Sequence, residues 1–277
     1  MKNIKDTLFK NPIFRSIGIA SINILFFSQT IKSWFEKNIF NPYEIDGNKN
    51  ANYALAQITA ILSHLDISEK SILEIGPGGN YYLACLLLKH GANKVFVIDN
   101  ENHNFFSEQE IAIYKDIYPE SISDTKTINQ DKIVVLRYGR NETIPLSNHS
   151  IDIIYSNAVL EHVFHPKKLI KECLRILRTG GKMMHQIDYR DHIFDQQSLF
   201  FLRIPNILFD CLFKKTGMWV NRLRHSHWLF IFESSNQLNI LSDEKQTSHI
   251  VSKKLDKLTS DDFKTTSELF ILEKYAD

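Results

Sequence analysis

The sequence of 277 residues has little net charge and little cysteine. With 33 Lys and Arg against 32 Asp and Glu its formal net charge is +1, so nothing in the overall charge favours bulk binding of nucleic acid. The three cysteines, Cys85, Cys173 and Cys211, are widely spaced and form no zinc-binding pattern. We expect the first two to be buried free thiols in helices, in a reducing compartment.

Long hydrophobic runs are also scarce. Residues 16–31 are uncharged and largely apolar, but the stretch is too short to span a bilayer comfortably, and Ser, Asn and Gln interrupt it. Basic residues precede it, as in a signal peptide, yet no small-x-small cleavage site follows before Trp34. We expect helices within residues 1–50 that pack on the core, with peripheral membrane contact as the alternative.

The most informative stretch is residues 71–100, SILEIGPGGNYYLACLLLKHGANKVFVIDN, which has the order of parts of a nucleotide-binding βαβ unit. Residues 71–75 predict a strand that leads into the turn G-P-G-G at residues 76–79, where the absence of Cβ lets backbone approach a ligand. A helix should follow, with Asn80 as its N-cap and Gly91 as its left-handed C-terminal cap.

Two carboxylates indicate which ligand this unit binds. Residues 94–98 predict a second buried strand, and Asp99 follows it where an acid reaches ribose hydroxyls in open parallel sheets. Glu74 lies inside the strand before the turn, where a carboxylate would repel a pyrophosphate and would suit a cationic ligand. The turn also lacks the third glycine of G-x-G-x-x-G, which disfavours an NAD-dependent oxidoreductase.

The motif E-I-G-P-G-G followed by V-I-D resembles motif I and the second-strand acid of the S-adenosylmethionine-dependent methyltransferases with a Rossmann-like fold. The resemblance implies S-adenosylmethionine as the cofactor and S-adenosylhomocysteine as its product. Because S-adenosylmethionine carries a sulfonium and an ammonium and no phosphate, the carboxylate inside the first strand agrees with this family. The cofactor-binding residues that the resemblance implies are Glu74, Gly76, Gly78, Asp99 and Asn100.

Two later segments match this family to different degrees. Residues 150–163, SIDIIYSNAVLEHV, closely resemble its fourth strand and the continuation of that strand, which places Asn157 beside the methionine part of the cofactor. Residues 139–146, GRNETIPL, depart from the family because Arg140 replaces an acid that commonly meets the adenine amino group. Asn141 or backbone groups would then bind adenine, and a solvated loop position for Arg140 is an equal alternative.

Glu161 and His162 resemble part of the metal site of ubiquinone-biosynthesis O-methyltransferases. Asn157 stands where the first acid of that site would be, and two ligands without a third make a poor Mg²⁺ or Zn²⁺ site, so we expect no metal. His162 is a candidate general base or substrate hydrogen bonder, and a structural hydrogen bond is the alternative.

A polar cluster, D-Y-R-D-H at residues 188–192, follows the fifth predicted strand at the tip where an acceptor substrate should lie. An alcohol acceptor has to lose a proton, and histidine is the side chain best matched to accept it near neutral pH. His192 is therefore the first candidate for the base, with Asp188 orienting it or contacting the substrate. A salt-bridged loop is the alternative.

The region after this cluster is expected to carry specificity. Residues 194–213 predict one or two strongly apolar helices that form a lid, a dimer surface, a membrane-facing patch or a second core layer. The strings D-x-R-D-H and N-R-L-R-x-S resemble bacterial methyltransferase-domain proteins associated with surface-glycan biosynthesis. Three arginines are candidates for holding an anionic group of the acceptor, with solvated arginines as the alternative: Arg190, Arg222 and Arg224.

The alternation of strands and helices from residue 71 to residue 188 predicts an α/β fold. We expect a Rossmann-like seven-stranded, mostly parallel sheet with helices on both faces, an antiparallel C-terminal strand pair, N-terminal helices and an apolar helical insertion after strand five. The expected parts are an N-terminal helical extension at residues 1–50, a cofactor-binding core at 51–192, a helical lid or substrate insertion at 193–236, and C-terminal strands at 237–277 that complete the sheet.

The predicted function is in-line methyl transfer to a hydroxyl of a small molecule or glycan. The sequence after strand four lacks an N-P-P-Y-like tetrapeptide, which disfavours methylation of nucleobase amines, and a missing Pro-Cys pair disfavours a cytosine ring carbon. The alternative is a catalytically inactive methyltransferase-fold protein that acts as a partner-binding or membrane-associated subunit. The expected location is cytoplasmic, with peripheral contact at the inner face of the membrane and a homodimer both left open.

Overall fold

A computed structural model of the chain describes residues 47–99, 106–123, 127–139, 142–193, 199–214, 218–247 and 260–276. The helices predicted within residues 1–50 lie outside these ranges, apart from residues 47–50. Three residues singled out in the sequence, Asn100, Arg140 and Asn141, lie outside them as well.

The described chain separates into two compact units. The sheet unit contains the described residues of 45–187, 229–244 and 269–277, and the insertion unit contains those of 188–228 and 245–268. The four parts predicted from the sequence divide the chain differently and stay a prediction.

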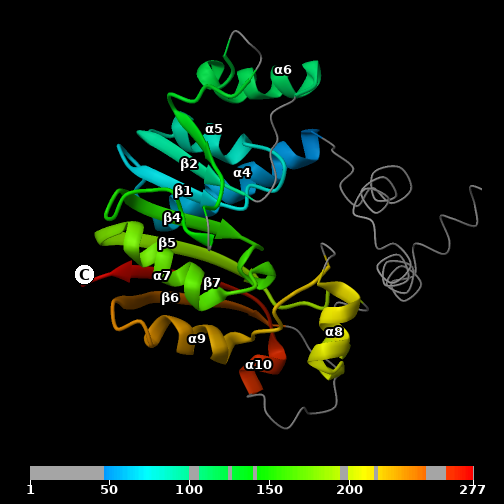
Figure 1. The fold of residues 1–277 in the computed structure, drawn as a ribbon. Helices are drawn as coiled ribbons and strands as arrows, with labels where there is room; N and C mark the ends of the chain where they lie inside the picture. The colour runs from blue at the N-terminus through cyan, green and yellow to red at the C-terminus, as the bar shows by residue number, and fades with distance from the viewer. Residues whose placement is uncertain are drawn as a thin grey trace, which may run out of the picture. The chain divides into compact units, whose positions relative to one another are not determined.

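A seven-stranded sheet with strand order β3-β2-β1-β4-β5-β7-β6 organises the fold (Figure 1). The first five strands in this order pair in parallel. The last pair is antiparallel: Tyr275 N donates to Gln237 O, and Thr266 Oγ1 donates to Gln246 O, so the end of β7 lies beside the start of β6. The predicted fold class is therefore confirmed. The strands are β1 (Ser71–Ile75), β2 (Lys94–Ile98), β3 (Ile133–Leu136), β4 (Ile151–Asn157), β5 (Leu177–Asp188), β6 (Leu238–Thr247) and β7 (Thr265–Lys274).

Helices cover both faces of the sheet, with α4 and α5 on one face and α7 and α9 on the other (Figure 1). The helix α5 is buried along almost its whole length, so its leucines and Cys85 form the core beneath β1 and β2. Cys85 and Cys173 are buried free thiols, as predicted, and Cys211 is an exposed free thiol. The helices are α4 (Gly47–His64), α5 (Tyr82–Lys89), α6 (Glu108–Ile117), α7 (Pro166–Ile176), α8 (Asn206–Phe213), α9 (His225–Glu233) and α10 (Ser260–Lys264), with 3₁₀ turns η1 (Pro119–Ser121), η3 (Leu160–His162) and η4 (Phe200–Arg203).

The motif helix α5 begins one residue later than the sequence indicated. Its N-cap position is Tyr81, and Asn80 Oδ1 accepts a hydrogen bond of 3.1 Å from Tyr82 N, so Asn80 satisfies an amide of the first turn from just outside the helix. Gly91 has a φ of +100°, which confirms the left-handed C-terminal position expected for it.

The glycine pair at residues 180–181 does not end a helix, although glycine is common just after a helix end. The helix α7 ends at Ile176, and the glycines lie inside β5. Ile151 pairs with Leu177 whereas Ile153 pairs with Lys182, so the chain between these two partners bulges out of the ladder, and the first glycine adopts a φ of +77° there.

The insertion unit has a small apolar core of its own. Its buried side chains include Phe201, Phe209, Phe213 and Trp219, so the apolar segment after strand five does form a second core layer. Among the described helices, none combines the length and the apolar character that a bilayer-spanning segment requires.

Candidate active site

The glycine turn after β1 lies at the carboxyl end of the parallel strands. Gly76 and Gly78 adopt φ angles of +69° and +71°, which only glycine reaches at little cost. Gly76 N donates to Ile98 O at 2.9 Å, which joins the turn to the end of β2. A Cβ on Gly76 would come within 2.6 Å of Val159 Cγ2, so the chain after β4 packs directly on the turn.

Glu74 is the most unusual group at this edge. Its neighbours in the sheet are Val97 on β2 and Tyr155 on β4, and its residue is only 5% exposed. Its Oε2 atom has no hydrogen-bond partner in the described part of the chain. Burial, together with the nearby charge of Asp99, raises the pKa of Glu74 to about 8. The carboxyl group therefore holds a proton at neutral pH that a bound cation would displace.

Asp99 follows β2 directly and is half-buried beside the turn. This position is the one expected for an acid that binds ribose hydroxyls. Its expected companions Asn100 and Asn141 lie outside the described residues. The structure thus brings five of the seven predicted cofactor residues to one edge of the sheet: Glu74, Gly76, Gly78, Asp99 and, at the end of β4, Asn157.

Tyr53 on α4 is a residue of this edge that the sequence did not reveal. Asn157 Nδ2 donates a hydrogen bond of 2.6 Å to Tyr53 Oη, although 104 positions separate the two residues, and Tyr53 is 56% exposed. Periodicity alone assigns Tyr53 to the solvent side of α4, because the neighbouring Ala54 and Ile58 face the core. The contact depends on tertiary structure, so no local sequence pattern predicts it.

The other side of β4 is held by a buried pair. Ser156 Oγ and His185 Nδ1 lie 2.8 Å apart, and both residues are fully buried. Burial lowers the pKa of His185 to about 3, so its imidazole is neutral. Because Ser156 precedes Asn157, this pair and Tyr53 fix the end of β4 from two directions.

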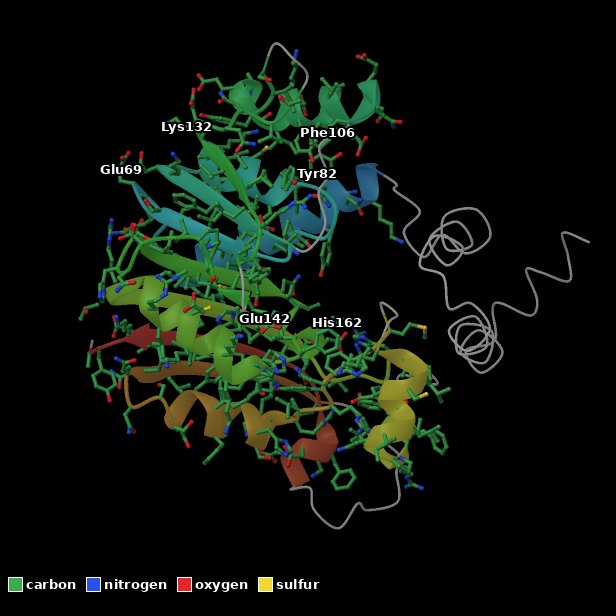
Figure 2. All side chains as sticks on the ribbon, in the orientation of Figure 1. Glu69, Tyr82, Phe106, Lys132, Glu142 and His162 are labelled. Carbon is green, nitrogen blue, oxygen red and sulfur yellow. The ribbon has the colours of Figure 1, made fainter. Side chains whose placement is uncertain are left out.

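His162 lies on the 3₁₀ turn that follows β4. Its backbone N donates to Val159 O at 2.9 Å, which places His162 one turn away from the side chain that packs on Gly76. Figure 2 shows it at the edge of the sheet opposite Glu69, which precedes β1. His162 is half-buried and its neighbour Glu161 is buried. The predicted base candidate therefore belongs to the same edge as the cofactor residues.

In the insertion unit, the structure brings Asp188, Arg190 and His192 together. Arg190 Nη2 lies 2.6 Å from Asp188 Oδ2, and His192 Nε2 lies 3.4 Å from the same oxygen. Burial acts to raise the pKa of Asp188, but hydrogen bonds from His192 and Arg190 outweigh it and hold that pKa well below its usual range. Asp188 is therefore a carboxylate that orients His192 while it also pairs with an exposed arginine.

Arg224 is engaged in the interior of the insertion unit. It is 1% exposed and donates to the carbonyl oxygens of Asp262 at 2.7 and 2.9 Å and of Thr265 at 2.8 Å, as well as to Tyr189 O. Burial lowers its pKa to about 10, which leaves it protonated at neutral pH. These contacts use the guanidinium to hold backbone segments together.

Arg222 is engaged in a similar way. Its Nη1 donates to Ile204 O at 2.7 Å, and its guanidinium lies 4.4 Å from the centre of the Phe209 ring. Of the three arginines suggested by the sequence, Arg190 is the exposed one.

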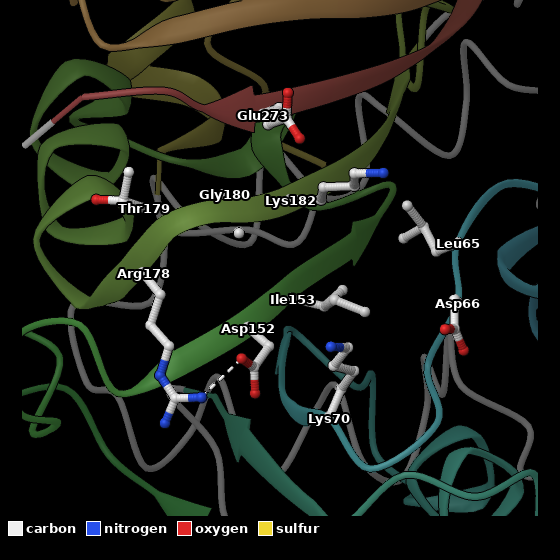
Figure 3. A pocket seen from close by; sticks show the side chains of 11 residues that line it. Leu65, Asp66, Lys70, Asp152, Ile153, Arg178, Thr179, Gly180, Lys182 and Glu273 are labelled. Carbon is white, nitrogen blue, oxygen red and sulfur yellow. Dashed lines mark hydrogen bonds and ion pairs between the residues drawn. The ribbon is translucent and has the colours of Figure 1, made fainter.

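A cavity of about 430 Å³ lies at the opposite edge of the sheet (Figure 3). Lys70 before β1, Asp152 and Ile153 of β4, and residues 178–182 of β5 line it, and Arg178 Nη1 pairs with Asp152 Oδ1 at 2.7 Å. These residues lie at the amino ends of β1 and β4, whereas ligands of open parallel sheets bind at the carboxyl ends. The cavity is therefore separate from the edge that carries the predicted cofactor residues.

Comparison with known proteins identifies the core of the sheet unit. Residues 73–185 match the family model of a methyltransferase domain. A Mycolicibacterium smegmatis protein named as an S-adenosylmethionine-dependent methyltransferase is 27% identical over 112 residues, which cover 40% of this chain and 35% of that protein. A similarly named Mycobacterium tuberculosis protein is 25% identical over 118 residues, 42% of this chain and 34% of its own length. The chain thus spans about a third of the length of these curated relatives.

A solved structure agrees in fold. A chain from the complex between the Haloferax volcanii Trm112 methyltransferase activator and its methyltransferase partner superimposes with a TM-score of 0.51 and 14% identity, covering 89% of this chain and 96% of that one. At this identity the likeness concerns the fold alone. The matched residues, the glycine turn and the sheet order agree: residues 73–185 are similar to a methyltransferase domain of the S-adenosylmethionine-dependent class, and the fold is Rossmann-like.

Proposed function

We propose that the protein transfers a methyl group from S-adenosylmethionine to a hydroxyl oxygen of a small molecule or glycan. The observation that carries the proposal is Glu74, a buried carboxyl group near the end of β1 whose Oε2 atom has no partner among the described residues, two positions before the left-handed Gly76. Such a group fits a ligand that is cationic at one end and carries no phosphate. S-adenosylmethionine, when bound, supplies a methyl group activated by a sulfonium centre, and its ammonium is the cation that suits Glu74.

The chain's own residues would then divide the work of cofactor binding. Glu74 gives up its proton to pair with the ammonium, and the backbone at Gly76 and Gly78 allows close approach because no Cβ intervenes. Asp99 accepts hydrogen bonds from the ribose hydroxyls. Asn157, held by Tyr53, borders the methionine part. Asn100 and Asn141 complete the proposed set by their positions in the sequence.

For the acceptor we propose His192 as the general base. Asp188 is ionised and lies 3.4 Å from His192 Nε2, so it stabilises the imidazolium that forms when the acceptor hydroxyl gives up its proton. Arg190 is the proposed contact for an anionic group on the acceptor, since it is exposed and its position is fixed by Asp188. His162, at the cofactor edge, is the second candidate for the base.

The choice of a hydroxyl acceptor rests on what the sequence lacks and on one resemblance. The motifs of nucleobase amine and cytosine carbon methylation are missing, and residues 188–192 with 221–226 resemble proteins associated with surface glycans. We place the protein in the cytoplasm, where S-adenosylmethionine is made available to it.

A transfer assay with labelled S-adenosylmethionine and a panel of sugars and lipid-linked glycans tests the proposal. In His192→Gln, kcat should fall by a factor of about 10² to 10⁴, the usual share of a general base, while the affinity for S-adenosylhomocysteine stays unchanged. His162→Gln is the matched comparison. A full rate in His192→Gln with a loss in His162→Gln would transfer the role to His162, and full rates in both would refute base catalysis by either residue.

The second candidate is a methyltransferase-fold subunit without catalysis that binds a partner. The observation in its favour is the exposed apolar surface on α8, where Ile207 is 88% exposed. Cofactor binding separates the two candidates, because a subunit without catalysis does not require Glu74 and Asp99 to bind adenosyl ligands. A folded protein that binds no S-adenosylhomocysteine would favour this second candidate.

A further inference from the structure

The helix α8 is apolar on two opposite sides. Phe209 and Phe213, four positions apart, are buried in the core of the insertion unit. Ile207, Leu208 and Cys211, which share the other side, face solvent, with exposed fractions of 88% for Ile207 and 49% for Leu208. Phe200 on the preceding 3₁₀ turn is exposed as well, and we call these exposed apolar side chains the α8 patch: Phe200, Ile207, Leu208 and Cys211.

The solvent-facing side of α8 carries no charged side chain. The one ionisable carboxylate of the helix, Asp210, accepts a hydrogen bond of 2.8 Å from Trp219 Nε1 and is thereby directed into the insertion unit. Helices that are hydrophobic all round are found buried in protein or in contact with a membrane. One side of α8 packs on the core of the insertion unit. Its outer side is apolar as well, which is typical of a helix surface that binds a partner or a membrane.

Cations stand at both ends of the α8 patch. Arg203 precedes α8 and Lys214 follows it, and both are exposed. The same sign prevails over the described insertion unit, because its acids other than Asp261 are buried or half-buried. Its exposed charged residues are four cations and one anion: Arg190, Arg203, Lys214, Lys264 and Asp261. An apolar patch with cationic ends complements a surface that is apolar inside and negative outside.

We propose that the α8 patch docks on an anionic lipid membrane, with Ile207 and Leu208 entering the boundary between headgroups and acyl chains. Peripheral helices of this kind bind through buried apolar area plus attraction of Lys and Arg to anionic lipids. The same chain carries a second uncharged, largely apolar stretch at residues 16–31, preceded in the sequence by Lys10 and Arg15. This inference goes beyond methyl transfer and stands or falls independently of it.

A second copy of the chain fits the α8 patch less well. An interface between identical copies related by a twofold axis places the same patch on both sides, so Arg203 and Lys214 would approach their own counterparts. The described patch offers no exposed carboxylate to pair with them. Anionic headgroups attract both cations, whereas self-association brings like charges together.

Flotation of the full-length protein with vesicles tests the proposal. We expect binding to vesicles of phosphatidylcholine with phosphatidylglycerol, at least about tenfold weaker binding to phosphatidylcholine alone, and weakening by added salt because the attraction to headgroups is screened. The double variant Ile207→Asp with Leu208→Asp should reduce binding to the anionic vesicles by at least about tenfold, and Lys214→Glu by several-fold. Ile207, Leu208 and Lys214 are all exposed, so thermal unfolding and binding of S-adenosylhomocysteine should not change in either variant.

Leu55→Asp provides the matched control, because Leu55 on α4 has the same exposed fraction, 49%, as Leu208. This variant should bind vesicles like the wild type. Three results would overturn the proposal: no binding of the wild type to anionic vesicles, equal losses in the α8 variant and in Leu55→Asp, or a dimer in size-exclusion chromatography that the α8 variant converts to a monomer without a change in vesicle binding.

Discussion

Replacing Glu74 by Gln should make the ligand-free protein more stable at alkaline pH and should weaken its affinity for the cofactor. Burial and the charge of Asp99 raise the pKa of Glu74 from an ordinary value near 4.5 to about 8. Between these values the folded state binds a proton that the unfolded chain has released, so the free energy of unfolding falls as pH rises. At about 1.4 kcal/mol per pH unit, a pKa change of this size corresponds to a loss of about 5 kcal/mol, complete above about pH 8.

Urea unfolding of the ligand-free wild type and of Glu74→Gln, followed by circular dichroism from about pH 5 to about pH 8.5, measures this difference. Gln keeps the size of the side chain and does not titrate. The variant should therefore lack the fall in unfolding free energy with rising pH that Glu74 causes. The gap in unfolding free energy between the two proteins should therefore widen with pH by several kcal/mol, in favour of the variant.

Cofactor binding should show the opposite preference. Pairing with the ammonium of the ligand favours the carboxylate, so binding should release a proton and become tighter between about pH 6 and about pH 7.5. Calorimetric titration in buffers of different ionisation enthalpy detects that proton. Glu74→Gln should bind the cofactor weakly and should release no proton on binding. Parallel stability profiles for the two proteins, or binding of S-adenosylhomocysteine by the variant as tightly as by the wild type, would refute the assignment of Glu74.

Three further substitutions probe other parts of the structure. Gly76→Ala should lower the free energy of unfolding in urea by about 2 to 3 kcal/mol and weaken binding of S-adenosylhomocysteine, because the added Cβ meets Val159. A Cβ at Gly78 meets open space, so Gly78→Ala should lose only about 1 kcal/mol. Equal losses in the two variants would contradict the packing argument. Tyr53→Phe should weaken the same affinity by about three- to tenfold with a stability change below about 1 kcal/mol, and an unchanged affinity would remove Tyr53 from the site. Arg224→Lys should lower stability by roughly 3 kcal/mol, since an ammonium cannot replace the planar fork between three carbonyl groups; a thermal midpoint equal to that of the wild type would contradict a structural role.

Local sequence was sufficient to predict the secondary structure at residues 71–89. The strand, the turn and the helix of residues 71–89 follow from an apolar run, glycines and helical spacing, and all of these are properties of neighbours in the chain. The order of strands then places Glu74, Asp99 and Asn157 at one edge, because the carboxyl ends of parallel strands meet there.

Features that depend on distant partners could not be predicted in this way. The contact of Asn157 with Tyr53 joins two segments that are far apart in sequence, and the burial of Arg224 depends on carbonyl groups more than 30 residues away from it. The glycines at residues 180–181 have the pattern of a helix end, yet pairing of β5 with β4 on both sides of them draws them into the strand as a bulge. In each case tertiary contacts decided between conformations that the local sequence allows.

Calorimetric titration of the full-length protein with S-adenosylhomocysteine, S-adenosylmethionine and NAD, beside the variant Asp99→Ala, tests the central claim most directly. The proposed function predicts tight binding of both adenosyl ligands, strong weakening in Asp99→Ala and no heat with NAD. A folded protein that binds neither adenosyl ligand, or that binds NAD instead, would contradict it.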